Sequence, residues 1–424
     1  MSALLRLAAG LARRICVGAD ADLVLKPSSE PAPPDHGPVH LYVHLPFCRN
    51  RCPFCPYHKQ AWDPAMATPY LEAVLVEAGL HRRRWGTLTA ASLYLGGGTP
   101  TLLADRLPWF IDRLNAIIPL NGPVAVEVSP EVCSPGICRD LRRAGITQVS
   151  LGAQSFSTSV LATLGRRHDA ATTERAVSVL AEGGFSGLNV DLLFAVEGQS
   201  DDATADDLAR AIALGATQVT CYPLFHFVGT AVARDDGAGI PSLRLRHRQF
   251  RRIRAAATAA GLQPMSVWSF GQPGTPRYSS VTRQGYLGLG ASAASASESG
   301  ICVNTFSLDA YHQRVREGRF PTALRLDLSR RTAAAHWLYW RIYEGFIDRS
   351  GLESRFGTRG GAPGRLLAAA RLAGLAVREA EGWRLTGPGS FWVHLLQNHA
   401  VLDATARLWD HASRDAFPPG LDLA

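Results

Sequence analysis

Six short apolar runs, separated by longer segments with helical periodicity, constrain the fold of this chain more than any other feature. Most of these runs are nearly continuous in apolar residues, which is typical of strands that are buried on both faces. Such strands belong to parallel sheets, in which helices connect one strand to the next. The expected strands are Leu41–Phe47, Ser92–Gly98, Val124–Pro130, Gln148–Ser155, Gly187–Ala195 and Gln218–His226.

Helical patterns fill the segments between these strands. Successive strand–helix units predict an α/β fold of the partial parallel (β/α)6 barrel type, closed or nearly closed. Chemistry in such barrels gathers at the carboxyl ends of the strands, which here carry Gly96–Gly98, Glu127, Gln154, Asp191 and Tyr222. The clearest helical patterns are Pro69–Arg84, Asp105–Ile118, Ala170–Gly184 and Asp201–Leu214.

Composition shifts divide the chain into three parts. We expect residues 1–38 to be an N-terminal extension with a Pro- and Ser-rich linker, 39–316 to be the barrel with its extension, and 317–424 to be a small α+β module. Helical patterns at Asp327–Gly345 and Gly364–Gly374 precede a hairpin pattern at Ala376–Thr386, which suggests a winged-helix-like module. The module lacks a dense Lys/Arg cluster with Asn or Gln, so a structural or substrate-capping role is favoured over nucleic-acid recognition.

Charge and cysteine content bound the partners and the compartment. Lys and Arg number 44 against 36 Asp and Glu, and the excess is scattered Arg, which suits a basic cleft for a carboxylate- or phosphate-bearing small molecule. The 8 cysteines do not amount to a disulfide framework and favour a reducing, cytoplasmic setting. Arg6, Arg13 and Arg14 interrupt the apolar N-terminal stretch, so it lacks the core of a secretory signal. No apolar run approaches the roughly 20 residues that span a bilayer, and no membrane partner is expected.

Three cysteines, Cys48, Cys52 and Cys55, follow the first expected strand and lie within one short loop. Thiolates suit either zinc or an iron–sulfur cluster. A structural zinc site needs a fourth ligand, which His44 or His58 could supply. A cube cluster with three cysteine ligands leaves one iron open for a substrate, so the missing fourth cysteine favours a catalytic cluster.

A set of short motifs, in order along most of the chain, resembles the oxygen-independent coproporphyrinogen III oxidase family of radical S-adenosylmethionine (SAM) proteins. Each motif alone is weak, but the order and spacing of the set are highly specific. The motifs are the cysteine segment with the preceding Tyr42–Phe47, Gly96–Pro100, Glu127–Pro130, Leu151–Phe156, Val190–Leu193 and Tyr286–Gly290.

The resemblance implies a [4Fe-4S] cluster on the three cysteines and two molecules of SAM. The Gly97, Gly98 and Thr99 turn matches the segment that lets backbone approach the methionine amino group. The residues that match the contacts to the two SAM molecules are Glu127, Gln154, Arg166 and Asp191. An electron donor such as flavodoxin or ferredoxin is also implied.

Three departures from the family pattern guide the choice of reaction. Tyr57 stands where porphyrinogen-decarboxylating members carry a further cysteine, Tyr278–Gln284 lacks the axial histidine of the haem-trafficking members, and Phe194–Gly198 replaces a Tyr-Gly-Leu-Pro segment. The remaining resemblance is to class C radical SAM methyltransferases. The sequence therefore predicts transfer of a methyl or methylene carbon to an sp² carbon of a small-molecule or peptide-borne flat heteroaromatic substrate, a natural product or a tetrapyrrole. Oxidative decarboxylation of coproporphyrinogen III and haem binding as a chaperone are the alternatives.

Such a reaction needs a general base or proton relay, for which Tyr42, His44, Tyr222 and His226 are candidates at strand ends. A lone histidine on an apolar strand is more often a core residue, so these four are not ranked. Four aromatic residues of the C-terminal module could stack on a flat substrate or belong to the core: Trp337, Tyr339, Trp340 and Trp383.

Overall fold

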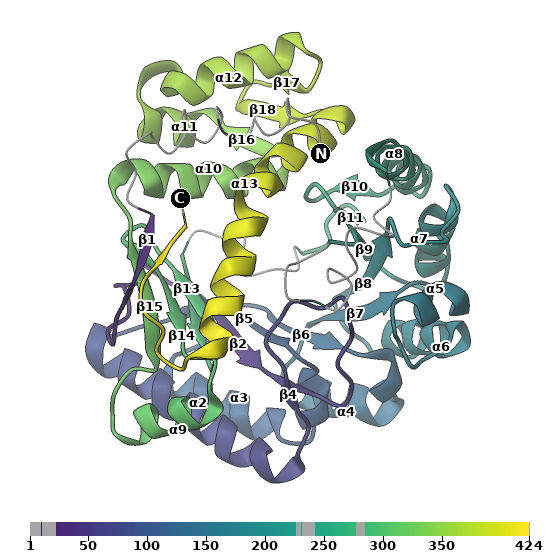
Figure 1. The fold of residues 1–424 in the computed structure, drawn as a ribbon. Helices are drawn as coiled ribbons and strands as arrows, with labels where there is room; N and C mark the ends of the chain where they lie inside the picture. Colours follow the sequence, from purple (N-terminus) through teal and green to yellow (C-terminus); the bar gives the residue numbers. More distant parts are fainter. Residues whose placement is uncertain (1–9, 11–22, 226–229, 231–241, 277–284, 424) are drawn as a thin grey trace.

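A large twisted sheet with helices on its outer side forms the body of the protein in the computed structural model (Figure 1). The model describes residues 23–225, 242–276 and 285–423, together with positions 10 and 230. The sheet has 14 strands in the order β10-β11-β9-β8-β7-β6-β5-β2-β12-β13-β14-β15-β1-β19. Its parallel half consists of β2 (Val39–Leu45), β5 (Ala90–Gly97), β6 (Val124–Val128), β7 (Gln148–Gln154), β8 (Gly187–Phe194) and β9 (Gln218–Pro223).

These six strands confirm the expected partial barrel, because each pairs in parallel with its neighbour from β9 across to β2. Their alternate residues are buried against the helices, as in the fully buried Leu41, Val126 and Val190. The sheet continues past β2 and does not close on itself among the described residues. The connecting helices are α2 (Pro64–Trp85), α3 (Leu107–Ile117), α4 (Pro135–Arg143), α5 (Thr158–Thr163), α6 (Ala170–Ala181), α7 (Ala203–Ala213) and α8 (Leu243–Ala259).

The second half of the sheet is mainly antiparallel. β12 (Tyr286–Leu289) pairs in parallel with β2, and beyond it β13 (Ala294–Ala296), β14 (Gly300–Asn304) and β15 (Thr322–Asp327) run back and forth. α9 (Leu308–Arg316) connects β14 to β15. β1 (Val24–Pro27) and β19 (Leu421–Asp422) complete this edge, so the sheet includes strands from both parts that we expected to flank the barrel. The short strands β10 (Gln263–Pro264) and β11 (Ser269–Gly271) extend the opposite edge beyond β9.

The C-terminal module stands above the open side of the sheet in Figure 1. Its core gathers Trp337, Leu338, Ile347 and Trp383 between helices and a three-stranded sheet. The helices are α10 (Arg330–Glu344), α11 (Arg349–Phe356) and α12 (Gly361–Leu372), and the strands are β16 (Phe346–Asp348), β17 (Ala376–Arg378) and β18 (Gly382–Leu385). The two expected helices and the hairpin are thus present, in a helix-and-wing arrangement. α13 (Gly387–Arg414) then crosses back over the face of the molecule toward β19 (Figure 1).

Two helices differ from the sequence expectation for local reasons. α2 begins at Pro64 rather than Pro69, because the Asp63 side chain accepts a hydrogen bond from the Ala65 N–H and Pro64 occupies the first turn. Pro69 lies inside the helix. The sequence did not predict α13, which starts in a Gly-Pro-Gly segment that resembles a loop, but Thr386 caps it by accepting from the Gly389 N–H.

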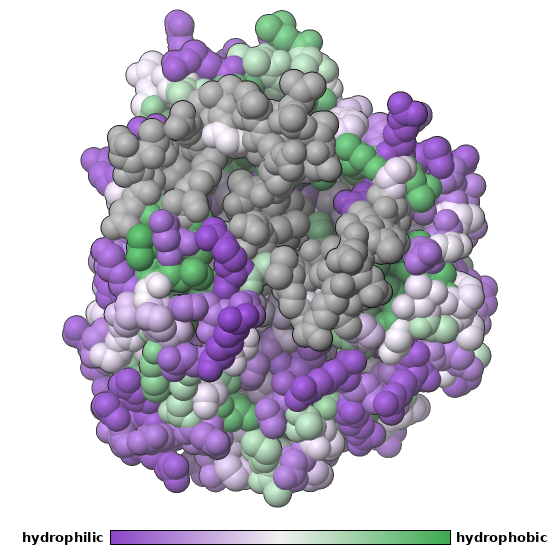
Figure 2. Space-filling view, in the orientation of Figure 1, coloured by the Kyte–Doolittle hydropathy of each residue, from purple (hydrophilic) through white to green (hydrophobic). Residues whose placement is uncertain are grey.

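The visible surface is largely polar, with apolar atoms gathered in patches (Figure 2). One patch lies at the top of the C-terminal module, where Leu372 is 88% exposed and Val377 is 46% exposed. Within the described residues, none of the helices combines the length and the apolar character needed to cross a bilayer. His226, Tyr278–Gln284 and nearly all of the N-terminal stretch lie outside the described residues.

Candidate active site

The cysteine loop leaves the carboxyl end of β2 and is fixed at both ends. β3 (Phe47–Cys48) pairs in parallel with β4 (Gln60–Ala61), which brings the two ends of the loop together. Inside the loop, the Lys59 ammonium donates to the Cys55 carbonyl at 2.9 Å, and the Cys55 N–H donates to the Cys52 carbonyl at 3.2 Å. Cys48 is buried, and Cys52 and Cys55 are half-buried.

The three thiols fit an iron–sulfur cluster better than a single metal ion. All three are free of disulfides, and the donor set consists of soft sulfur atoms only. Burial raises the pKa of the Cys48 thiol to about 11, because the thiolate is poorly solvated there. Coordination to a metal cluster would stabilise this thiolate, which is the form that binds metal.

His44 is occupied by two hydrogen bonds and does not supply the fourth ligand of a zinc site. Its Nε2 lies 3.2 Å from the His58 carbonyl oxygen, and its Nδ1 lies 2.9 Å from the Tyr42 hydroxyl. Nε2 therefore carries the proton, and Nδ1 accepts from Tyr42. Burial lowers the pKa of His44 to about 3, which keeps the ring neutral. Tyr42 and His44 thus form a hydrogen-bonded pair, as a proton relay requires, but their catalytic role stays a prediction.

The glycine turn at the end of β5 packs directly beneath the cysteine loop. The Gly98 N–H donates to the Leu45 carbonyl and the Thr99 N–H donates to the Phe47 carbonyl, both at 2.8 Å. A Cβ atom on Gly98 would lie 2.5 Å from the Phe47 oxygen, and Gly97 has a φ of +114° with the His44 ring 2.7 Å from its Cβ position. Only glycine fits this close approach of two backbones. The Thr99 hydroxyl lies 3.7 Å from the Cys48 sulfur.

Glu127 on β6 is a buried carboxylate beside this turn. It accepts from the Gly97 N–H at 3.1 Å and from the Tyr94 hydroxyl at 2.6 Å. No cation pairs with Glu127 among the described residues. Burial, with the nearby charge of Asp191, raises the pKa of Glu127 to about 7.

Asp191 on β8 has the same character. It accepts from the Ser150 hydroxyl at 2.7 Å and from the Asn189 amide at 2.9 Å, and burial raises its pKa to about 6. Neutral donors therefore hold both carboxylates in place. Neither carboxylate pairs with a cation in the part of the chain that the structure describes, and a bound ligand would supply the positive charge.

Gln154 ends β7 with a strained backbone. Its φ of 71° is rare for a residue other than glycine, and the pairing of β7 with β8 shifts register between Leu151 and Gln154. Such strain is found at functional sites, because the surrounding structure must hold it. Ala195, within the Phe194–Gly198 departure, has a φ of 59°, and its N–H donates to the Gln249 side chain at 3.1 Å.

Arg166 links the cysteine loop to β7. Its guanidinium donates to the Cys52 sulfur at 3.2 Å and to the Gly152 carbonyl at 3.1 Å, and Glu131 lies 3.9 Å away. Glu131 in turn lies 3.3 Å from the Nδ1 of buried His168. Despite partial burial, these contacts to His168 and Arg166 lower the pKa of Glu131 to about 2, so it remains ionised and holds Arg166 against the loop.

Tyr222, at the end of β9, meets the C-terminal module. Tyr343 of α10 is a hydrogen-bonding partner of Tyr222, and both are close to Tyr57 of the cysteine loop. Trp383 belongs to the core of the C-terminal module, whereas Trp340 packs edge-on against Tyr343 at 5.9 Å. α10 therefore carries aromatic side chains to the strand ends, as a module with a capping role would.

The structure brings the predicted residues together at the carboxyl ends of β2 and β5–β9. Sequence reasoning missed several residues that support them, because they belong to no recognisable motif. Strand alternation could have found two, since Tyr94 lies two residues before Gly96 and Asn189 two residues before Asp191 on the same strand face. The other residues that were missed are Glu131, Ser150, His168 and Tyr343.

Comparison with known families identifies the class of this protein. Residues 42–211, which hold every predicted cluster and SAM residue, match the model of the radical SAM superfamily. The chain therefore contains a radical SAM domain, which implies a [4Fe-4S] cluster and SAM. The second SAM stays a prediction.

Named relatives narrow the class further. The chain is similar to members of the family of oxygen-independent coproporphyrinogen III oxidases and heme chaperones. It is 32% identical to the heme chaperone HemW of Mycobacterium tuberculosis over 254 residues, which cover 57% of this chain and 65% of the chaperone, so it spans less than two thirds of that relative. It is 28% identical to the oxygen-independent coproporphyrinogen III oxidase of Paracoccus denitrificans over 308 residues, 67% of this chain and 68% of the oxidase.

The fold of a solved relative agrees. The structure of coproporphyrinogen III oxidase (HemN) from Escherichia coli matches with a TM-score of 0.73 at 23% identity, covering 85% of this chain and 89% of the other. The shared fold thus includes the C-terminal module as well as the barrel.

The expectation of a C-methyltransferase, with natural-product biosynthesis as its setting, is wrong. It depended on departures at a few positions, whereas the similarity to proteins named as oxidases and chaperones extends over hundreds of aligned residues. A departure at a single loop position such as Tyr57 does not outweigh that agreement.

Proposed function

We propose that the protein is an oxidative radical SAM enzyme that decarboxylates propionate side chains of a porphyrinogen, as a coproporphyrinogen III oxidase does. The extent of the similarity supports this choice over the chaperone alternative. A coproporphyrinogen III oxidase of Cereibacter sphaeroides aligns over 80% of this chain and 80% of its own length, including part of the C-terminal module. The alignment with the chaperone stops at 57% of this chain.

A half-buried arginine near the strand ends supports a substrate that carries carboxylates. Arg246 lies on α8 one turn before Gln249, whose side chain accepts from the Ala195 N–H at the carboxyl end of β8. Residues three apart share a helix face, so Arg246 also faces the strand ends. Burial lowers its pKa, and its buried Nε has no hydrogen-bond partner among the described residues. A carboxylate of a substrate would satisfy this charge.

The residues of this chain have separate tasks in such a reaction. Cys48, Cys52 and Cys55 would hold the cluster, and Gly97, Gly98 and Thr99 would admit the methionine end of SAM beside it. Glu127 and Asp191, ionised, would attract the positive groups of one or two SAM molecules. When bound, the cluster and SAM supply a 5′-deoxyadenosyl radical that removes a hydrogen atom from a propionate side chain, after which CO2 and one electron leave and a vinyl group remains. The electron passes to an external one-electron acceptor.

Tyr57, Tyr222 and Tyr343 lie close to one another and come from the cysteine loop, β9 and α10. Their rings would exclude water from a primary carbon radical, which attacks whatever it touches. In the Tyr42–His44 pair, Nδ1 of the neutral, buried ring accepts the hydrogen bond of the Tyr42 hydroxyl.

The test is anaerobic turnover of the reconstituted protein with coproporphyrinogen III, SAM, a reductant and a one-electron acceptor. We expect 5′-deoxyadenosine together with a porphyrinogen lighter by the elements of formic acid for each vinyl group formed. Cys52→Ala should abolish both products. Arg246→Gln should raise KM for coproporphyrinogen more than it lowers kcat, with Arg246→Lys intermediate.

The result that would overturn the proposal is tight haem binding without 5′-deoxyadenosine above the level of the Cys52→Ala variant. That outcome would favour the chaperone alternative.

A further inference from the structure

A cavity of about 690 Å³ separates the C-terminal module from the antiparallel half of the sheet. α10 and α11 form two of its walls, and the connection between β13 and β14 forms a third. The volume lies within the usual range of small-molecule sites, about 300–1,000 Å³. None of the residues assigned above to the cluster or to SAM lines it, and neither does Arg246, whereas Trp337 and Trp340, two of the aromatic residues expected to stack or to belong to the core, do.

The lining of the cavity is basic. It includes Arg330, Arg331, Arg341 and Arg355, against the carboxylates of Asp35 and Glu298. Arg355 donates to Glu298 at 3.1 Å, and Arg341 pairs at 2.8 Å with Glu344, which lies outside the lining. Asp35 lies in the wall with a raised pKa caused by burial, and its carboxylate accepts from the Glu298 N–H.

Arg330 and Arg331 are in the first turn of α10, where the backbone N–H groups add positive potential. The cavity therefore attracts anions at the end formed by this turn. Arginine is suited to carboxylate groups in particular, since its planar fork can bind both oxygens of one carboxylate.

The same cavity has an aromatic side. Trp337 and Trp340 are three residues apart on α10, so both face the cavity from one side of the helix. The Arg355 guanidinium lies 4.7 Å from the centre of the Trp337 ring, which fixes both groups by a cation–π contact. A rigid aromatic wall beside several guanidinium groups suits a flat ring system with acidic substituents.

His336 argues against a ligand bound through a metal. The Trp340 indole N–H donates to His336 Nε2 at 3.1 Å, which leaves the proton on Nδ1. Burial lowers the pKa of His336 to about 4, so the ring is neutral and has no lone pair free for a metal. The lining thus offers N–H donors rather than a metal ligand.

We propose that this cavity is a second binding site, for a flat aromatic polycarboxylate, and that its ligand is a metal-free tetrapyrrole. The ligand class follows from the lining, whereas the choice of a tetrapyrrole rests on the proposed function. Arg330 binds a carboxylate, Arg331 adds positive charge at the same end of the cavity, and Trp340 contacts the ring.

α10 connects this site to the strand ends. Arg330 and Tyr343 are 13 residues apart on one helix, about 20 Å at 1.5 Å per residue. A ligand in the cavity therefore sits near the reacting centre without occupying it. Because a porphyrinogen is neither flat nor aromatic, the ligand that suits this lining is the oxidised porphyrin rather than the substrate itself.

The test uses the reconstituted holoprotein without reductant and oxidised coproporphyrin III as the probe. Binding is measured by the quenching of tryptophan fluorescence and by the shift of the porphyrin absorption. We expect saturable binding that the double variant Arg330→Glu/Arg331→Glu weakens at least tenfold. Both arginines are exposed, so the fold should tolerate the change.

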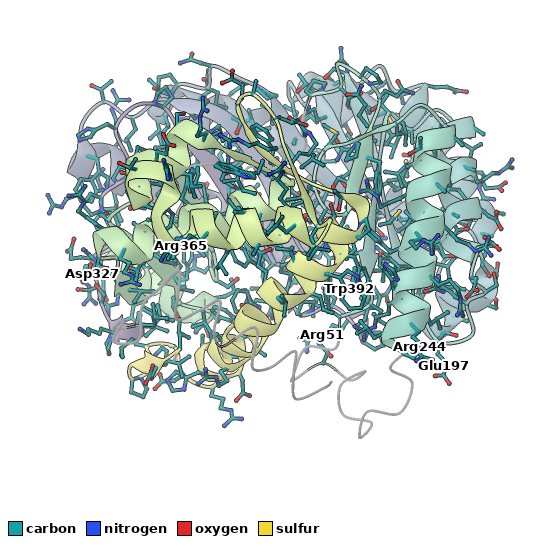
Figure 3. The ribbon with its side chains drawn as sticks, turned by 90° about the horizontal axis from the view of Figure 1, so that it is seen from above. Arg51, Glu197, Arg244, Asp327, Arg365 and Trp392 are labelled. Atoms are coloured by element: carbon teal, nitrogen blue, oxygen red, sulfur yellow. The ribbon has the colours of Figure 1, made fainter. Side chains whose placement is uncertain are left out.

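The matched control is Arg365→Glu on α12, an exposed arginine of the same module that does not line the cavity and that Figure 3 labels. It should bind coproporphyrin as the wild type does. Citrate, an anion of similar charge without a ring, should not compete with the porphyrin.

Binding lost equally in the double variant and the Arg365 control would show a general charge effect and overturn the proposal. Binding lost with Arg246→Gln but unchanged in the double variant would place the porphyrin at the strand ends alone, which also overturns it. A turnover assay runs in parallel. If turnover fails while the double variant still weakens binding, the proposed function is wrong and the second site stands.

Discussion

The pH dependence of SAM binding tests whether Glu127 contacts that ligand. The pKa of this carboxyl is raised from 4.5 to about 7 by burial, so it is largely protonated below pH 7 before a ligand arrives. A positively charged ligand binds the ionised form. The apparent Kd therefore equals the intrinsic Kd divided by the ionised fraction, which is about one tenth at pH 6 and about nine tenths at pH 8.

We accordingly expect the Kd for SAM to be about tenfold weaker at pH 6 than at pH 8. The sign follows from the direction of the shift, because affinity is gained as pH rises through the raised pKa. Asp191, with a pKa of about 6 and an electrostatic interaction with Glu127, would broaden the transition toward lower pH.

The assay is equilibrium dialysis of labelled SAM against the anaerobic, cluster-loaded protein between pH 5.5 and 8.5. Glu127→Gln is the matched control, since it keeps the shape of the side chain and removes its titration. Titration of SAM itself affects both proteins alike, so the ratio of the two Kd values isolates Glu127. A ratio that stays constant with pH would refute the reasoning.

Three further changes test the surroundings of the site. Gly98→Ala places a methyl group 2.5 Å from the Phe47 carbonyl oxygen. This change should weaken SAM binding at least about tenfold and leave the circular dichroism spectrum unchanged. Wild-type affinity for SAM would contradict the close approach of the glycine turn to the cysteine loop. Glu77 on α2 accepts from the Gly290 N–H, the Asn304 amide and the Tyr311 hydroxyl, so Glu77→Ala leaves three buried donors without this partner. This change should lower the free energy of unfolding by at least about 3 kcal/mol in urea titrations. Glu72→Ala, on the exposed side of the same helix, should change the free energy of unfolding little. Arg166→Gln removes a charged donor from the Cys52 sulfur. The reduction potential of the cluster should fall by on the order of 60 mV, which is one tenfold change in a one-electron equilibrium, in an EPR-monitored titration. An unchanged potential would exclude this contact in the cluster-loaded protein.

The sequence predicted the parallel half of the sheet closely, because its strands are buried on both faces and such burial leaves a nearly continuous apolar run in the sequence. The antiparallel half was less visible. Its strands are short, as in Ala294–Ala296, and small residues such as Ala, Ser and Gly give little alternation. β1 and β19 pair through only two residues each with their neighbours on that edge, and no local pattern indicates partners nearly 400 positions apart in the chain.

The candidate site shows the same division. Cysteine spacing and the glycine turn are local patterns, so Cys48 and Gly98 could be found from the sequence. Glu131 and His168 act on Arg166 through contacts between separate strand–helix units, which only the fold reveals. The choice of reaction failed for another reason: it depended on departures at a few positions, whereas the similarity to the named relatives extends over hundreds of residues.

The chain leaves the sheet after β15, forms the C-terminal module, and returns to the same edge of the sheet at β19, which pairs with β1. Among the described residues, Val24–Asp422 and Leu25–Leu421 form this pairing, and the Leu423 N–H donates to the Leu23 carbonyl at 3.0 Å, so a short ladder joins the end of nearly a hundred intervening residues to the sheet. During synthesis this ladder can form only after residues 421 and 422 have left the ribosome, which makes it a late step in folding.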